Sequence, residues 1–179
     1  LLNYQSNCTY KQHAADFWKL SYYWMGINLR DVIKLQWSNV HDDKIFYYRS
    51  KTFRRSKVKR KNTVFLDKRT TAIINKYKGR GSYIFNVLDD SMTEEQKYRS
   101  GKNFIRKINQ HLKRLAIELN ISKDISSIWS RHSFATEMKK KKVSPYIIQE
   151  AFGHKDIKTT ENYMSSLIKE DLRNLQNLL

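Results

Sequence analysis

The stretch Arg131-His132-Ser133-Phe134-Ala135-Thr136 is followed along the chain by Gly153-His154 and then by Thr159-Thr160-Glu161-Asn162-Tyr163. His154 lies 23 residues after Arg131, and Tyr163 lies 9 residues after His154. A lone Tyr is usually a core residue, and a lone His is usually a satisfied surface or capping group. Several fixed points at set separations are far more specific than one short motif. We therefore interpret the rest of the chain around this constellation.

Hydrophobic periodicity predicts helices on both sides of this stretch. One helix is expected near residues 130–140, and another near 144–152, with Pro145 at its first position and Gly153 at its end. Short helical pieces should lead from there to the terminus. The clearest helix upstream has one apolar face, formed by Phe104, Ile105, Ile108, Leu112, Leu115, Ala116 and Leu119.

The amino-terminal half is expected to mix helices with a hairpin. A helix over residues 10–24 should stop near Gly26, and Asn28 can cap a second helix that carries Val32, Ile33, Leu35 and Trp37. Residues 39–43 are expected to form a turn. The runs 45–49 and 63–66 are β-branched and aromatic, which predicts a hairpin with a basic loop. Residues 68–77 should be helical, 83–85 extended, and 89–100 a polar loop, with a single helical turn as an alternative within it.

The composition bounds the class of protein. A length of 179 residues fits a single domain, and 35 Lys and Arg against 17 Asp and Glu leave a net charge of +18. Such a charge is best tolerated when the partner is a polyanion, so nucleic acid is the first partner to consider. An anionic membrane surface is the competing interpretation, but we find no run of roughly 18 apolar residues and no signal peptide, which predicts a soluble, intracellular protein.

Two further features concern cysteine and the start of the chain. The single Cys8 has no partner for a disulfide or a zinc cluster, and we expect a reduced thiol and no metal site. The chain begins at Leu1 without Met. We therefore expect residues 1–179 to be one domain of a longer protein whose amino-terminal partner domain is missing.

The spaced stretch resembles the carboxy-terminal signature of the tyrosine site-specific recombinases, the phage integrase family. In that family the pattern reads Arg-His-x-Phe-Ala-Thr, then Leu-Gly-His, then a Tyr soon after. The resemblance extends to residues 26–32 with Leu35 and Trp37, and to the hairpin segment at residues 48–52. It therefore covers most of the chain, and it is nearest to the integrases of conjugative and mobilisable elements. The fold that it implies is a mainly α domain with a small antiparallel β-sheet.

The resemblance also implies a chemistry. Arg131 would give two parallel hydrogen bonds to the non-bridging oxygens of a DNA phosphate, and Tyr163 would attack the phosphorus to form a 3′-phosphotyrosyl link. Lys51 would protonate the departing 5′ oxygen, although Lys57 or Lys59 could be the reaching group. His154 would donate to the phosphate or assist proton movement. The link stores the bond energy, so no ATP, metal or other cofactor is expected.

The sequence departs from the family pattern where the first catalytic Arg is expected. Asn28 stands in the usual position and Met25 in the position that mobile-element relatives use. Arg30 lies in the same segment, but two residues along a helix turn a side chain by roughly 200°. Arg49 is the better substitute, because alternation along a strand would put it on the same face as Lys51. Contact with the DNA backbone alone is an equally open role for Arg49.

A second departure lies at Ile128, three residues before Arg131, where the family usually has His and its mobile-element branch often Tyr. Ile cannot donate a hydrogen bond. The neighbouring Trp129 has an indole donor, but nothing in the sequence directs it toward the site. Our hypothesis is an active but atypical enzyme.

Basic residues are concentrated between residues 49 and 61, where eight occur without an acidic one. Because this run coincides with the expected hairpin loop, it predicts a loop that grips the DNA backbone. The side chains expected to contact DNA are Arg54, Arg55, Lys57, Lys59 and Arg60. A second block at residues 139–142 is equally compatible with phosphate contact and with plain solubility.

The family implies an assembly, and the sequence leaves three rivals. The expected assembly is a homotetramer on two DNA sites that exchanges strands through a Holliday junction, in a prokaryotic cytoplasm. The apolar stripe of the tail either packs in the core or docks on a neighbouring subunit; it consists of Leu167, Ile168, Leu172, Leu175 and Leu179. The rivals are a catalytically dead DNA-binding relative, a related type IB topoisomerase and a general basic scaffold protein.

Overall fold

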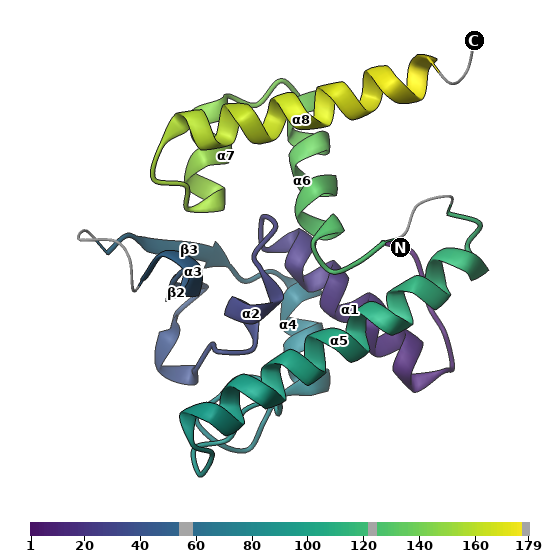
Figure 1. Cartoon of the computed structure of the whole chain (residues 1–179). Coiled ribbons are helices and arrows are strands. Elements are labelled where there is room, and N and C mark those ends of the chain that lie inside the picture. Colours follow the sequence, from purple (N-terminus) through teal and green to yellow (C-terminus); the bar gives the residue numbers. More distant parts are fainter. Residues whose placement is uncertain (54–58, 122–124, 177–179) are drawn as a thin grey trace.

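Helices dominate the fold, and one small sheet lies at its edge (Figure 1). The computed structural model describes residues 1–53, 59–121 and 125–176, and in these ranges it leaves out the side chains of residues 52 and 166–175. The sheet has three antiparallel strands in the order β1-β2-β3. The prediction of a mainly α fold with a small antiparallel sheet is therefore confirmed. Within the described ranges, no helix is both long and apolar enough to cross a membrane.

Two long helices form the main core. Helix α1 (Thr9–Tyr23) packs against helix α5 (Glu94–Glu118), and helix α4 (Lys68–Tyr77) lies against α1. The apolar face predicted for α5 is buried at Ile108, Leu112 and Leu115, whereas Leu119 is 38% exposed because the helix has ended. This core holds the elements that carry the site.

Helix α5 begins earlier than expected. Residues 89–100 were predicted as a polar loop, but the helix starts at Glu94. Thr93 caps it and forms a capping box with Gln96, and Glu94 and Glu95 suit the positive end of the helix dipole. These local signals outweigh the polarity of the segment, so the prediction was wrong over its second half.

The hairpin is confirmed. Strands β2 (Lys44–Tyr48) and β3 (Lys61–Phe65) pair antiparallel, and the buried Ile45 faces the buried Val64. The turn expected at residues 39–43 is tighter than predicted, because β1 (Val40–His41) already pairs with β2 around Asp42, whose φ is 53°. After β2 the chain enters a short helix, α3 (Ser50–Phe53).

The second predicted helix is shorter than expected. Asn28 caps it as predicted, accepting from the backbone N–H of Arg30, but α2 (Leu29–Val32) ends before Leu35. Just before the 3₁₀ turn η1 (Trp37–Asn39) and at its first residue, the chain pairs with residues 82–84: Ile84 donates to the Leu35 carbonyl, and Trp37 donates to the Ser82 carbonyl. These bonds to a distant segment replace the helical ones.

The carboxy-terminal part contains helices α6 (Trp129–Lys140), α7 (Pro145–Phe152) and α8 (Ile157–Gln176). The first two confirm the prediction, whereas α8 is one continuous helix and not the expected short pieces. Helix α6 rises from α1 to α8, and α7 lies between α8 and β3 (Figure 1). A second apolar cluster, centred on Ala135, Ile148 and Phe152, joins these helices.

Gly153 is needed at the end of α7. Its φ is 59°, a left-handed conformation, and a Cβ there would lie 2.2 Å from Oδ1 of the buried Asn62 on β3. The glycine therefore ends the helix and also allows close approach of the hairpin.

We expect Gly153→Ala to lower the free energy of unfolding by at least about 1 to 2 kcal/mol, since both the backbone conformation and the contact are unfavourable. Urea denaturation measures this. In Gly153→Ala with Asn62→Ala the contact is relieved and part of the loss should return. Gly81→Ala, where φ is not positive, is the control. Equal stability of the Gly153 and Gly81 variants would contradict this account.

Candidate active site

Arg131 occupies the centre of the candidate site. It lies in the first turns of α6, is only 5% exposed, and reaches toward two other segments. Its Nη1 donates to the carbonyl of Gly26 at 2.9 Å, and its Nη2 donates to the carbonyl of Phe152 at 3.0 Å. The guanidinium also lies 3.7 Å from the centre of the Phe152 ring. Since a buried charge is costly unless it is hydrogen-bonded, these contacts fix its orientation.

Gly26 can lie this close to Arg131 because it has no side chain. Its φ is 73°, and a Cβ would lie 2.9 Å from the Arg131 Cα. The turn after α1 thus brings a backbone carbonyl directly onto the guanidinium. Burial, followed by the charge of Arg49, lowers the pKa of Arg131 to about 10, so the group stays a cation at neutral pH.

His154 is held next to Arg131. Its Nε2 lies 3.1 Å from Nη2 of Arg131, and its Nδ1 lies 2.9 Å from the hydroxyl of the buried Thr160. A guanidinium can only donate, so Nε2 accepts and the ring proton lies on Nδ1. Burial, followed by the charges of Arg131, Arg49 and Lys51 in that order, lowers the pKa of His154 to about 4. The imidazole is therefore neutral at physiological pH.

Tyr163 projects from α8 to the same region, but its hydroxyl bonds elsewhere. The oxygen lies 2.7 Å from Nδ1 of His132, and the two rings stack with centroids 5.2 Å apart. The Tyr163 ring meets Phe152 edge-on at 5.5 Å and His154 at 6.4 Å. Burial raises the pKa of Tyr163 to about 12, against the opposing effect of Arg131. The phenol is thus protonated at neutral pH.

Arg49 and Lys51 do not lie on one strand, so the argument from strand alternation was wrong. Strand β2 ends at Tyr48, and Ser50 begins the helical turn α3, where its N–H donates to the buried carboxylate of Asp31 at 2.9 Å. Both cations nevertheless act on the site, because the charge of each lowers the pKa of His154. The charge of Arg49 also acts on Arg131.

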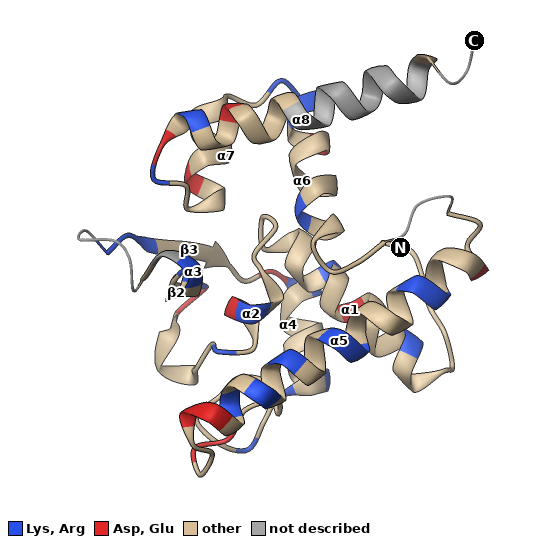
Figure 2. Cartoon of the chain, viewed as in Figure 1, with Lys and Arg blue, Asp and Glu red and all other residues tan. Residues whose placement is uncertain are grey.

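The hairpin residues expected to contact DNA have different surroundings. Arg60 donates to the carbonyl of His154 at 3.1 Å and forms an ion pair with Glu150 on α7. Lys59 lies over the ring of Phe53, 4.3 Å from its centre. Arg54, Arg55 and Lys57 lie outside the described residues. Figure 2 shows Lys and Arg at the hairpin end of β3 and along α5.

Two positions where the family has other residues lie at the starts of helices. Asn28 caps α2, and Arg30 is exposed on that helix. Ile128, 40% exposed, is the N-cap of α6, and its carbonyl accepts from the N–H of Arg131 at 3.0 Å.

Sequence reasoning missed the partners that orient the constellation. These are two backbone carbonyls, Thr160 and His132. The carbonyls have no signal in the sequence, since any residue supplies one. Thr160 and His132 both stood inside the quoted stretches, so their proximity in sequence to His154 and Arg131 was the available signal.

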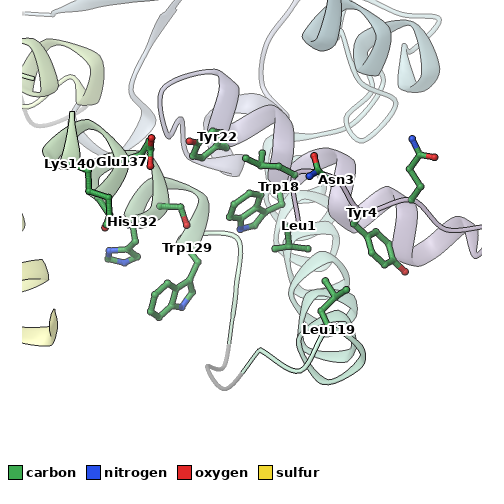
Figure 3. A pocket seen from close by; sticks show the side chains of 14 residues that line it. Leu1, Asn3, Tyr4, Trp18, Tyr22, Leu119, Trp129, His132, Glu137 and Lys140 are labelled. Atoms are coloured by element: carbon green, nitrogen blue, oxygen red, sulfur yellow. The ribbon is translucent and has the colours of Figure 1, made fainter. Parts of the chain in front are cut away.

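A hollow of about 970 Å³ lies beside the site but does not contain it. Figure 3 shows His132 and Trp129 projecting from α6 on the side where Trp18, Tyr22 and Leu1 lie. Among the described residues, its lining includes His132 but not Arg131, His154 or Tyr163. The side chains of the candidate site lie instead where α6, α7 and α8 meet.

Residues 8–170 match the sequence pattern described as Phage integrase family. The chain belongs to the phage integrase family. A curated member, the tyrosine recombinase XerA of Saccharolobus solfataricus, is 43% identical over 63 residues, which is 35% of this chain and 21% of that protein.

Solved structures of integrase-family proteins share the fold. The XerH site-specific recombinase in a post-cleavage complex with palindromic difH substrate superposes with a TM-score of 0.60 at 13% identity, over 98% of this chain and 48% of that one. The Tn1549 transposon integrase in complex with circular intermediate DNA gives 0.58 at 15% identity, over 96% and 61%. XerA recombinase gives 0.51 at 16%, over 96% and 64%. The chain thus spans less than two thirds of the length of each of these proteins.

The lowered pKa of His154 makes stability depend on pH. Between pH 6.5 and about pH 4 the unfolded chain binds a proton that the folded site excludes. As the pH falls through this window, the free energy of unfolding should drop by up to about 3 kcal/mol from this residue. Urea denaturation of wild type and of His154→Asn at several pH values tests this, and the variant should show the shallower slope. His41→Asn, at an exposed position, is the control. If the free energy of unfolding of wild type and of His154→Asn changed with pH in parallel, the pH dependence could not come from His154.

Proposed function

We propose that residues 1–179 form the catalytic domain of a site-specific recombinase that cuts and rejoins double-stranded DNA through a covalent link to Tyr163. The observation that carries this proposal is the convergence of a buried guanidinium, a neutral imidazole and a phenol, with Arg131 3.1 Å from His154 and Tyr163 next to both. Family membership supports it. An amino-terminal domain outside this sequence is part of the proposal.

Arg131 is suited to hold the phosphate. A guanidinium has five N–H donors, and the three bonds to Gly26, Phe152 and His154 engage three of them. The others can reach the non-bridging oxygens of a phosphodiester. Stabilising the charge of a pentavalent phosphorus by preorganised donors is the largest contribution that such a site can make. His154 keeps Arg131 in place, and a bound phosphate would raise the pKa of the imidazole and let it donate.

Cleavage and rejoining then need no external energy source. The oxygen of Tyr163 attacks the phosphorus as its proton leaves, the bond to the 5′ oxygen breaks, and the Lys51 ammonium protonates that oxygen. The 3′-phosphotyrosyl link conserves the bond energy, so the 5′ hydroxyl of a second strand can reverse the reaction. The proposal therefore includes independence from metal ions and ATP.

Arg49 is proposed to replace the missing first arginine. Its charge lowers the pKa of both Arg131 and His154, which supports a role for its cationic group at the same phosphate. Arg30 is exposed on α2, and its charge is not among those that act on the pKa of Arg131 or of His154.

The remaining parts of the proposal concern DNA grip and assembly. The basic hairpin, with Arg54, Arg55, Lys57, Lys59 and Arg60, would contact the DNA backbone, and the net charge of +18 supports such a partner. The DNA complexes of XerH and of the Tn1549 integrase point the same way. We also propose a homotetramer in a prokaryotic cytoplasm, with the tail docking on a neighbouring subunit; the side chains of its apolar stripe lie outside the described residues.

Covalent capture tests the central claim. The probe is a pool of nicked duplexes with randomised sequence, in which cleavage releases a short strand and traps the protein on DNA. Wild type should give an adduct that survives denaturing electrophoresis, and sequencing of the captured DNA identifies the site. Tyr163→Phe should give none while retaining DNA binding in a filter assay. An adduct in Tyr163→Phe, or none in wild type, refutes the mechanism. Relaxation of any plasmid, whatever its sequence, would instead favour a topoisomerase.

The role of Arg49 is tested with a matched pair. Arg49→Ala should slow adduct formation on the captured sequence by about 100-fold, the usual cost of losing one donor to a charged transition state. Arg30→Ala removes the same charge from the neighbouring helix and should change the rate by less than about threefold. Equal effects of the two substitutions would show that Arg49 contributes charge alone.

A further inference from the structure

The contact between Tyr163 and His132 assigns a role to a side chain other than those of Arg131, His154 and Lys51. We propose that His132 is a catalytic residue whose Nδ1 takes the proton of the Tyr163 hydroxyl when the strand is cut. The inference rests on the proposed function, because it concerns the nucleophile of that reaction.

The nucleophile needs a proton acceptor. Tyr163 is half-buried and packed edge-on against Phe152, and burial raises the pKa of its phenol to about 12. Almost none of it is phenolate at neutral pH, and a neutral phenol is a weak nucleophile. An adjacent base that removes the proton during attack solves this problem.

The geometry suits His132 for this task. Its Nδ1 lies 2.7 Å from the Tyr163 oxygen, within the range required of a general base. The rings of His132 and Tyr163 stack at 11° between their planes, and the ring of Trp129, three residues earlier in α6, lies 5.3 Å from the imidazole, so packing orients it. For Nδ1 to accept, the ring proton lies on Nε2.

Other nearby groups are poorer acceptors. Both nitrogens of His154 are engaged, by Arg131 and Thr160, and the lowered pKa of that ring makes it a weak base. Lys51 is a cation, and the carboxylate of Asp31 is buried against the N–H of Ser50. Among the described residues around Tyr163, His132 is the imidazole that touches the reacting oxygen.

His132 lies near Ile128, the position at which the sequence lacks the polar side chain of the family pattern. The two residues lie four positions apart at the start of α6, where the N–H of His132 bonds to the Ile128 carbonyl at 3.2 Å. Positions i and i+4 share one helix face. An imidazole is thus present one turn after the position where the sequence lacks a polar side chain.

The proton balance is complete. In cleavage the Tyr163 O–H bond breaks and its proton goes to Nδ1 of His132. The bond from oxygen to phosphorus forms, the bond to the 5′ oxygen breaks, and Lys51 supplies the proton to that oxygen. In rejoining, Lys51 takes the proton of the incoming 5′ hydroxyl, the tyrosinate leaves, and His132 returns its proton.

Two substitutions separate basicity from hydrogen bonding. His132→Asn places an amide oxygen near the position of Nδ1, which can accept a hydrogen bond but cannot take up a proton, and His132→Phe keeps only the stacking. Both should slow adduct formation on the captured duplex by about 100-fold or more, the usual contribution of general-base catalysis. Ser133→Ala, next along α6, is the control and should keep the wild-type rate. Thermal unfolding checks that the variants fold.

A more acidic nucleophile should bypass the base. A difluorinated tyrosine incorporated at position 163 should raise the rate of adduct formation by the His132→Asn variant by about tenfold or more. In the protein that retains His132, the same replacement should change this rate far less. If the wild type forms the adduct and His132→Asn does so equally fast, or if fluorination restores nothing, the inference is overturned while the proposed function stands.

The contact itself is tested without DNA. The ¹⁵N resonance of His132 Nδ1 should report a hydrogen-bonded acceptor in the free protein and should shift in Tyr163→Phe. An unchanged resonance would overturn the inference independently of any cleavage result.

Discussion

The guanidinium of Arg131 is the constraint around which the site is built. It is a charge with 5% exposure, and two segments far apart in the sequence supply the acceptors that burial requires: the turn at Gly26, and the end of α7, where Phe152 and His154 lie two residues apart. A buried cation that lost one of these acceptors would be costly. The left-handed Gly26 lets the turn after α1 come close to this cation, and the left-handed Gly153 lets β3 come close to the end of α7.

The charges around this cation are unbalanced. Arg49 and Lys51 add to the positive field, while Asp31 is the acidic side chain that acts on Arg131. The folded protein thus keeps several like charges near each other, and burial first, followed by their repulsion, lowers the pKa values of Arg131 and His154. If the site binds a phosphodiester, as proposed, the anion would relieve this repulsion.

The sequence was sufficient for the fold class, for most helices and for the hairpin, because these follow from apolar periodicity and from turn residues. It failed where distant backbone groups compete with local preference, as when Leu35 and Trp37 pair with residues 82–84. It also placed Lys51 on a strand, because the bond from Ser50 to Asp31 that accompanies the helical turn joins residues 19 positions apart. Arg131, His154 and Tyr163 were named from their spacing, but their orienting partners were not, since spacing carries no information on which atom meets which.

Two neighbouring residues of α6 link the surroundings of the guanidinium to those of Tyr163. Arg131 and His132 are consecutive, and successive helical residues diverge by about 100° around the axis. One therefore faces the Gly26 turn and the other faces Tyr163. Because one planar peptide unit joins the two residues, the backbone fixes the spacing between the segment that carries the guanidinium and the segment that carries the imidazole next to Tyr163.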